Sequence, residues 1–161
     1  MTAATILQTT RIIYYVLLAG QCLYGLVTLY LFYVQPDGFQ TGELPYRIAF
    51  YVPALLILAM YFGARFISKS RLAAANRIRG GLAAKLGHYR ITTIIRSAVA
   101  EAGNLFVLTF ALMTFDGQLL LYFAAGLAMF LVFRPRITEF EAAYPLSGGE
   151  QSELDRLKNP R

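Results

Sequence analysis

The residue with the clearest potential for chemistry is Glu101, the one acidic residue inside four long apolar segments of this 161-residue chain. A carboxylate at membrane depth is costly, so it marks a candidate functional site and needs a nearby partner. It could bind an ion or a proton there. Alternatively, it could hydrogen-bond neighbouring helices without any role in transport, which is the interpretation that its surroundings favour.

Polar residues accompany Glu101 at helical spacing. Thr93, Ser97, Glu101 and Asn104 follow one another at steps of four, four and three, so they share one face of a helix. The helix containing Glu101 would reach the outer edge of the membrane at Asp116. Counting back from Asp116 at about 1.5 Å per residue gives about 22 Å to Glu101. In a hydrocarbon core of about 30 Å, Glu101 would therefore lie roughly 8 Å inside the opposite, cytoplasmic edge. Residues of the preceding apolar segment reach a similar depth. The candidate ion- or proton-binding set is therefore Glu101, Asn104, Ser97, Tyr61 and Arg65.

The apolar segments themselves predict the fold class. The chain is 57% hydrophobic and 15% charged, whereas soluble domains carry about 25% charged residues. Three charge-free runs of 25, 17 and 17 residues, and one of 19 interrupted only by Glu101, match the roughly 17 to 25 residues of a membrane-spanning helix. We therefore predict an all-α integral membrane protein, an antiparallel four-helix transmembrane bundle with spans at about 11–34, 47–66, 93–115 and 117–133.

Turn-forming residues separate the spans and set the domain boundaries. Pro36-Asp37-Gly38 ends the first span, and Asp116-Gly117 joins the last two spans as a close hairpin. Residues 1–136 are predicted to form the transmembrane domain. Residues 137–161 are polar and are interrupted by Pro145 and Gly148-Gly149, which predicts a mobile cytoplasmic tail.

The net charge of +6 is concentrated in one predicted loop, residues 65–96, which contains no acidic residue. Its basic residues are Arg65, Lys69, Arg71, Arg77, Arg79, Lys85, Arg90 and Arg96. Basic residues in short loops stay on the cytoplasmic side, so both termini are predicted to be cytoplasmic, in the inner membrane of a bacterium. This distribution argues against a nucleic-acid partner.

Helix-forming residues at 72–75 favour a second helix that continues past its apolar segment. Gly80-Gly81 interrupts this helix, and a further helix is predicted for 82–90.

The same loop could bind the anionic headgroups of the surrounding lipid bilayer. The residues predicted for this role are Lys69, Arg71, Arg77, Arg79 and Lys85. Equally, the basic residues could serve only to fix the orientation of the chain in the membrane.

An internal repeat would organise the spans as two duplicated hairpins. The segment 9–23 aligns without gaps to 92–106, pairing Gln21 with Asn104 and Leu18 with Glu101. Spans one and three would then be parallel equivalents. Apolar helices also match by chance, so both interpretations remain open.

Other kinds of chemistry find little support in the sequence. With one cysteine, Cys22, and one histidine, His88, the chain has no cluster of soft metal ligands, and we predict neither metal nor cofactor. No nucleophile–base pair or pair of carboxylates lies at membrane depth, so we predict no catalytic residue and no enzyme. The segment 146–151 (LSGGEQ) is similar to the signature motif of ABC ATPases, but the chain has no phosphate loop. We interpret it as a turn before a helix that Ser152 caps.

One segment resembles a known family. Ala98-Val99-Ala100-Glu101-Ala102, followed by 106–112 (FVLTFAL), resembles the ion-carrying helix of rotary-ATPase proteolipid (c-type) subunits. The resemblance implies that Glu101 carries a proton, and duplicated four-helix members of that family exist. No G-x-G-x-G helix precedes the segment here, and the polar loop is longer. In layout, the whole chain is similar to uncharacterised small four-span bacterial membrane proteins.

These observations favour a small multi-pass inner-membrane protein that is a non-enzymatic accessory or assembly component. Its expected partners are the bilayer, with anionic headgroups among its lipids, and either a second copy or another membrane protein. The alternative function is a proteolipid-like subunit that translocates protons or ions through Glu101.

Overall fold

The computed structural model describes residues 2–35 and 46–158, and within these ranges it contains helices and no strand. The elements in chain order are α1 (Ala3–Val34), α2 (Tyr46–Ala73), the short 3-10 helix η1 (Ala75–Arg77), α3 (Leu82–Thr114), α4 (Leu119–Val132), α5 (Ile137–Ala143) and α6 (Gly148–Lys158). The predicted all-α class is therefore confirmed for the described residues.

Three of these helices, α1, α2 and α3, are long and apolar enough to cross a membrane. The fourth candidate span needs α4 and α5 together, and these two helices are bent by 57° relative to each other. At about 1.5 Å per residue, the 14 residues of α4 measure about 21 Å, less than a hydrocarbon core of about 30 Å.

Helices α1, α2 and α3 each extend past at least one end of the span predicted for it, whereas α4 lies within its predicted span. Helix α1 begins at Ala3, because the hydroxyl of Thr2 accepts a hydrogen bond from the Thr5 N–H (3.3 Å) and caps the first turn. Helix α2 continues to Ala73 and α3 already begins at Leu82, so most of the predicted basic loop is helical. The break lies at Gly80, whose φ of +137° suits glycine.

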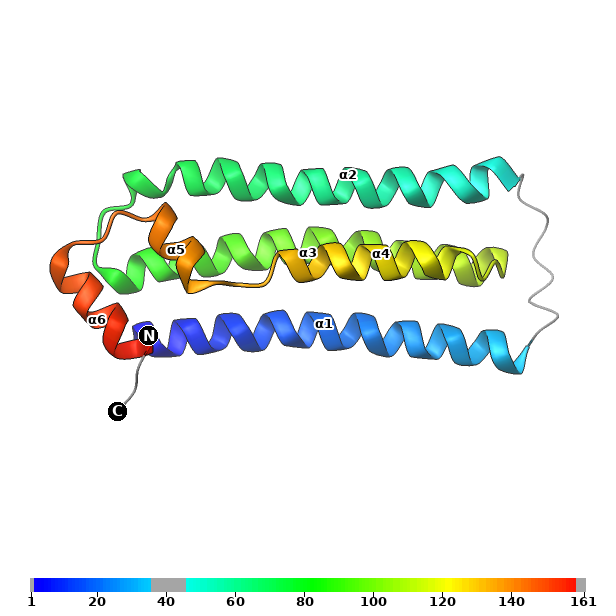
Figure 1. The fold of residues 1–161 in the computed structure, drawn as a ribbon, viewed down its shortest axis with the longest axis horizontal. Helices are drawn as coiled ribbons and strands as arrows, with labels where there is room; N and C mark the ends of the chain where they lie inside the picture. The colour runs from blue at the N-terminus through cyan, green and yellow to red at the C-terminus, as the bar shows by residue number, and fades with distance from the viewer. Residues whose placement is uncertain (1, 36–45, 159–161) are drawn as a thin grey trace.

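Helix α3 is the central element, since it contacts α1, α2 and α4 (Figure 1). Helices α1, α2, α3 and α4 alternate in direction along one axis, so α1 and α3 are parallel. Every buried residue of α1 has a buried counterpart 83 positions later in α3. The pairs are Ala3/Leu86, Ile6/Tyr89, Thr10/Thr93, Tyr14/Ser97, Gln21/Asn104, Gly25/Leu108 and Thr28/Ala111. This is the register of the aligned segments 9–23 and 92–106.

The predicted mobile tail is instead folded, and that prediction was wrong for residues 137–158. Helices α5 and α6 and the segment 144–147 between them, here called the cap, lie at the end of the helices where α1 begins (Figure 1). Phe140, Tyr144 and Leu154 are buried there in one apolar cluster. The cluster also contains Ala3, Ile6, Ala75, Leu82, Leu86 and Tyr89. The cap folds because these side chains leave water together.

The segment that is similar to an ABC signature begins α6 as a capping box. The Ser147 N–H donates to Glu150 Oε2 (2.7 Å), and the Glu150 N–H donates to Ser147 Oγ (3.4 Å). This reciprocal pair satisfies two backbone donors at a helix start. The cap residue is therefore Ser147 and not the predicted Ser152, and Gly148-Gly149 belong to the first turn of the helix.

Candidate functional site

Glu101 is half-buried on α3. It makes no hydrogen bond or ion pair with any residue that the structure describes. Arg65 donates to the Tyr61 hydroxyl (3.2 Å) on its own helix. The Ser97 hydroxyl is buried without a partner among the described residues. The predicted set of five residues therefore does not form one connected polar site.

Asn104, the fourth partner, forms a buried amide pair at the centre of the molecule. Its Nδ2 donates to Gln21 Oε1 of α1 at 2.6 Å, and both residues are essentially inaccessible to solvent. Gly126 of α4 faces this pair so closely that a Cβ there would overlap Asn104 Oδ1 and lie 3.0 Å from Cγ. Three helices thus meet around one hydrogen bond. Gln21 was not among the predicted site residues, although the repeat alignment pairs it with Asn104.

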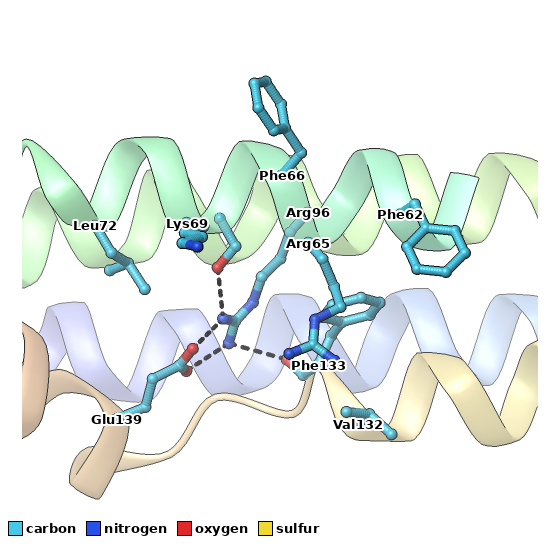
Figure 2. Close-up of a pocket in the computed structure, with 10 residues that line it drawn as sticks. Phe62, Arg65, Phe66, Lys69, Leu72, Arg96, Val132, Phe133 and Glu139 are labelled. Carbon is cyan, nitrogen blue, oxygen red and sulfur yellow. Dashed lines mark hydrogen bonds and ion pairs between the residues drawn. The ribbon is translucent and has the colours of Figure 1, made fainter. Parts of the chain in front are cut away.

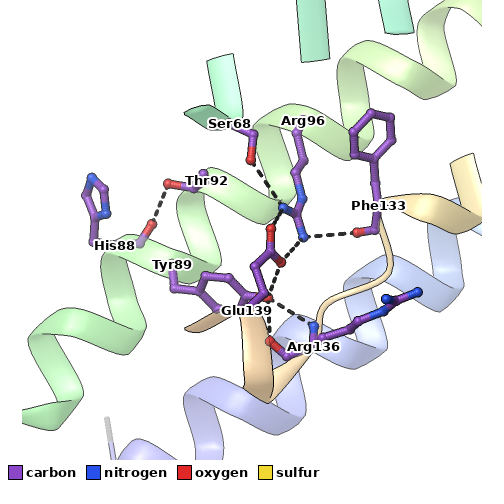
Figure 3. Close-up of polar contacts among 8 residues, drawn as sticks. All are labelled: Ser68, His88, Tyr89, Thr92, Arg96, Phe133, Arg136 and Glu139. Carbon is purple, nitrogen blue, oxygen red and sulfur yellow. Dashed lines mark hydrogen bonds and ion pairs between the residues drawn. The ribbon is translucent and has the colours of Figure 1, made fainter. Parts of the chain in front are cut away.

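Arg96 of α3 is the most deeply buried cation of the described residues, with 3% of its surface exposed. Its guanidinium holds both carboxylate oxygens of Glu139 in α5, and the Nη2–Oε2 distance is 2.7 Å. Figure 3 shows that it also donates to the Ser68 hydroxyl of α2 (3.2 Å) and to the Phe133 carbonyl after α4 (3.1 Å). The bidentate, charge-assisted contact with Glu139 joins α3 to α5, and the hydrogen bond to Ser68 joins α3 to α2. We call Arg96, Glu139 and their partners the arginine junction.

Tyr89 extends the arginine junction toward the linker between α4 and α5 (Figure 3). Its hydroxyl lies 2.8 Å from Glu139 Oε2 and accepts from the Arg136 N–H at 3.0 Å. Arg96 and Tyr89 are seven residues apart, which places both on one face of α3. The sequence singled out neither Tyr89 nor Glu139. The available signal was that a basic residue inside an apolar helix needs an acid, and Glu139 is the first acid after the last span.

Of the residues predicted to bind lipid headgroups, some are exposed and others already hydrogen-bond to residues of the protein. Lys69, Arg77 and Arg79 are exposed. Arg71 is half-buried and donates from Nε to Thr92 Oγ1 at 3.1 Å. Lys85 is 8% exposed and turns into the cap, where its Nζ donates to Glu150 (2.8 Å) and to the Pro145 carbonyl (2.6 Å).

The contact between Lys85 and Glu150 is expected to make the cap sensitive to acid. The hydrogen bond from Lys85, followed by that from the Ser147 N–H, lowers the pKa of Glu150 from 4.5 to about 2. A depressed carboxyl pKa contributes stability above the unfolded value, and this contribution is lost as the pH falls from about 4.5 toward 2. We expect a Leu146→Trp variant, whose tryptophan would be unique in the chain, to report loosening of the cap by fluorescence in this window.

The control for this titration is the same reporter combined with Glu150→Gln, which removes the titrating carboxyl. The transition between pH 4.5 and 2 should then become smaller, and the cap should be looser at neutral pH. An unchanged acid transition in the Glu150→Gln variant would show that another group is responsible.

The titratable side chains described above make contacts that hold elements of the fold together. His88 Nδ1 lies 2.6 Å from the Tyr144 hydroxyl, joining α3 to the cap. Within residues 2–35 and 46–158, no group of three or more His, Cys, Asp or Glu side chains is placed to hold a metal ion. The arginine junction, the amide pair and the Lys85–Glu150 contact each join elements that are distant in the sequence.

Comparisons with known proteins add no family to these observations. No protein-family model matches the chain, and no curated protein or solved structure matches it. The likeness of the segment around Glu101 to proteolipid subunits therefore stays a resemblance in sequence alone.

Proposed function

We propose that the protein is a multi-pass inner-membrane protein, a four-helix bundle with both termini in the cytoplasm, which acts as a non-enzymatic accessory or assembly component. The observation that carries this proposal is the use of the buried polar groups as ties between helices. Arg96, Asn104 and Lys85 each contact a partner on another element. Groups committed in this way stabilise a scaffold and are not free to bind a substrate.

The distribution of charge supports the proposed orientation. Lys69, Arg77 and Arg79 are exposed at the end of the molecule that carries the cap. Exposed basic residues near the ends of spans favour the cytoplasmic side. Helix α6 and the start of α1 would then lie in the cytoplasm, and the Asp116 turn outside.

The shared register of α1 and α3 supports an origin from two duplicated hairpins. When equivalent parallel helices pack around a two-fold axis along the membrane normal, matching residues meet across that axis. Gln21 and Asn104 match in the alignment and hydrogen-bond each other. The amide pair would mark the axis.

Exposed apolar side chains offer a surface for a membrane partner or a second copy. On α1, Leu23, Leu26 and Tyr30 are each more than 60% exposed. Such side chains suit lipid and the apolar face of another transmembrane helix equally well. An accessory component would use part of this surface for assembly.

Proton or ion translocation through Glu101 is the second candidate. It is favoured by one observation, that this half-buried carboxylate has no partner among the described residues. An ionisable group left unpaired at membrane depth is a functional-site candidate.

Two experiments, one on native membranes and one on reconstituted vesicles, separate the two functions. After crosslinking and mild solubilisation, an accessory component should be recovered in a stoichiometric complex with another membrane protein, whereas recovery as monomers only would contradict that role. In vesicles reconstituted with the purified protein, Glu101→Gln should leave proton flux unchanged, with Glu141→Gln in the cap as the matched control. Loss of flux in the Glu101→Gln variant alone would establish the second candidate instead.

A further inference from the structure

A cavity of about 580 Å³ opens on the side of the molecule between α2 and the junction of α4 with α5. Its lining combines two kinds of residue (Figure 2). The apolar ones include Phe62 and Phe66 of α2 and Val132 of α4, and the basic ones include Arg65 and Lys69 of α2. Residues 62, 65, 66 and 69 are spaced at three and four, so one face of α2 provides both the apolar and the basic part.

The electrostatics of this cavity favour an anion. Three basic side chains and one acidic side chain line it, and Glu139 neutralises only Arg96. Arg65 and Lys69 are exposed and make no ion pair with any residue in the described ranges. The guanidinium of Arg65 is also placed by a hydrogen bond to the Tyr61 hydroxyl (3.2 Å). Two positive charges therefore remain for a ligand.

The apolar residues beside these charges indicate what kind of anion fits. Phe62 is 62%, Phe66 74% and Val132 57% exposed, an arrangement that is unfavourable in water and suited to acyl chains. Arg65 and Lys69 come directly after the charge-free run 48–64 of α2, where a proposed span would leave the hydrocarbon core. The basic side chains would thus lie at the level of lipid headgroups, and the exposed apolar side chains beside them at the level of the acyl chains.

We propose that this cavity is a binding site for one anionic glycerophospholipid of the cytoplasmic leaflet. Arg65 and Lys69 bind its phosphate, and its acyl chains lie along Phe62, Phe66 and Val132. The proposal differs from a general attraction of the basic segment to the membrane surface, because it selects two of the cations and requires the apolar wall. It depends on membrane insertion and is independent of the accessory or proton-translocating role.

Native mass spectrometry of the purified full chain tests the site. In mild detergent we expect phosphatidylglycerol to be retained in preference to phosphatidylcholine with the same acyl chains. The double variant Arg65→Gln/Lys69→Gln should bind phosphatidylglycerol roughly 30-fold more weakly, from the contribution of two cations near the headgroup. The matched control is Arg77→Gln/Arg79→Gln, which removes the same charge from exposed residues that do not line the cavity.

Two outcomes of the binding measurements on the variants and lipids would overturn the proposal. One is an equal loss of binding in both double variants, which would indicate general electrostatic attraction, and the other is no preference for the anionic lipid. A third arm adds glycerol phosphate as a competitor that has the phosphate but no chains. It should displace little lipid at equal concentration, and displacement as effective as by phosphatidylglycerol would identify a phosphate site without a lipid role. Because both residues are exposed, thermal unfolding of the variants should match that of the unmodified protein.

Discussion

Replacing Glu139 with alanine is expected to destabilise the protein by about 3 kcal/mol, because it leaves Arg96 buried without a counter-charge. Arg96 is 3% exposed and holds Glu139 through both terminal guanidinium nitrogens, Nη1 and Nη2. Glu139 is 31% exposed, so water can enter the vacated space, and the expected loss lies at the low end for a broken buried pair. The measurement is the free energy of unfolding in detergent, with the loss of helix content as the signal that reports unfolding.

A matched control lies two residues further along α5. Glu141 is 25% exposed, comparable with Glu139, but its partner Lys158 is 29% exposed instead of buried. Exposed ion pairs contribute little, so Glu141→Ala should leave the unfolding transition nearly unchanged. Replacing both partners of the buried pair, as Arg96→Met/Glu139→Met, should recover much of the lost stability because no uncompensated charge remains. Equal losses for Glu139→Ala and Glu141→Ala would contradict the role of the arginine junction.

The all-α class and the long helices could be predicted from the sequence because composition and charge-free runs depend on local patterns alone. The geometry of the arginine junction could not, since Arg96 and Glu139 are 43 positions apart and only the packing of α5 brings them together. The cap was missed for a related reason. Pro145 and Gly148-Gly149 are turn signals, and turn signals do not reveal whether the residues around them are buried. The burial of Phe140 and Leu154 depends on α1 and α3.

The surroundings of Glu101 show another limit of sequence reasoning. Spacing along α3 places Ser97, Glu101 and Asn104 on one face, but it does not say which neighbouring helix each one meets. Asn104 turns to α1 and α4, where Gln21 and Gly126 lie. The gap-free alignment of 9–23 with 92–106 pairs Gln21 with Asn104 from the sequence alone. A comparison between two parts of one chain can therefore indicate a long-range contact that helical spacing cannot.

Gly126→Ala should have the second large effect, a loss of about 3 kcal/mol of stability. The added Cβ would overlap Asn104 Oδ1, and overpacking of a filled interior costs roughly 1 to 3 kcal/mol. Moving Asn104 would also break its hydrogen bond to Gln21 and leave buried amide groups unsatisfied. Gly63→Ala in α2 is the control, because a Cβ there meets nothing within 4 Å. That variant should unfold at the same temperature as the unmodified protein or slightly higher.

A double-variant cycle then tests whether the contact with Asn104 causes the loss. Asn104→Ala removes the group that the new Cβ meets, so the added cost of Gly126→Ala should be much smaller in that background. The single variant Asn104→Ala leaves Gln21 without its partner and should itself be destabilising. The two losses should therefore sum to more than the loss of the double variant, since residues in contact are not additive. Additive losses would mean that α4 does not approach the amide pair at Gly126, and the close meeting of three helices around it would have to be abandoned.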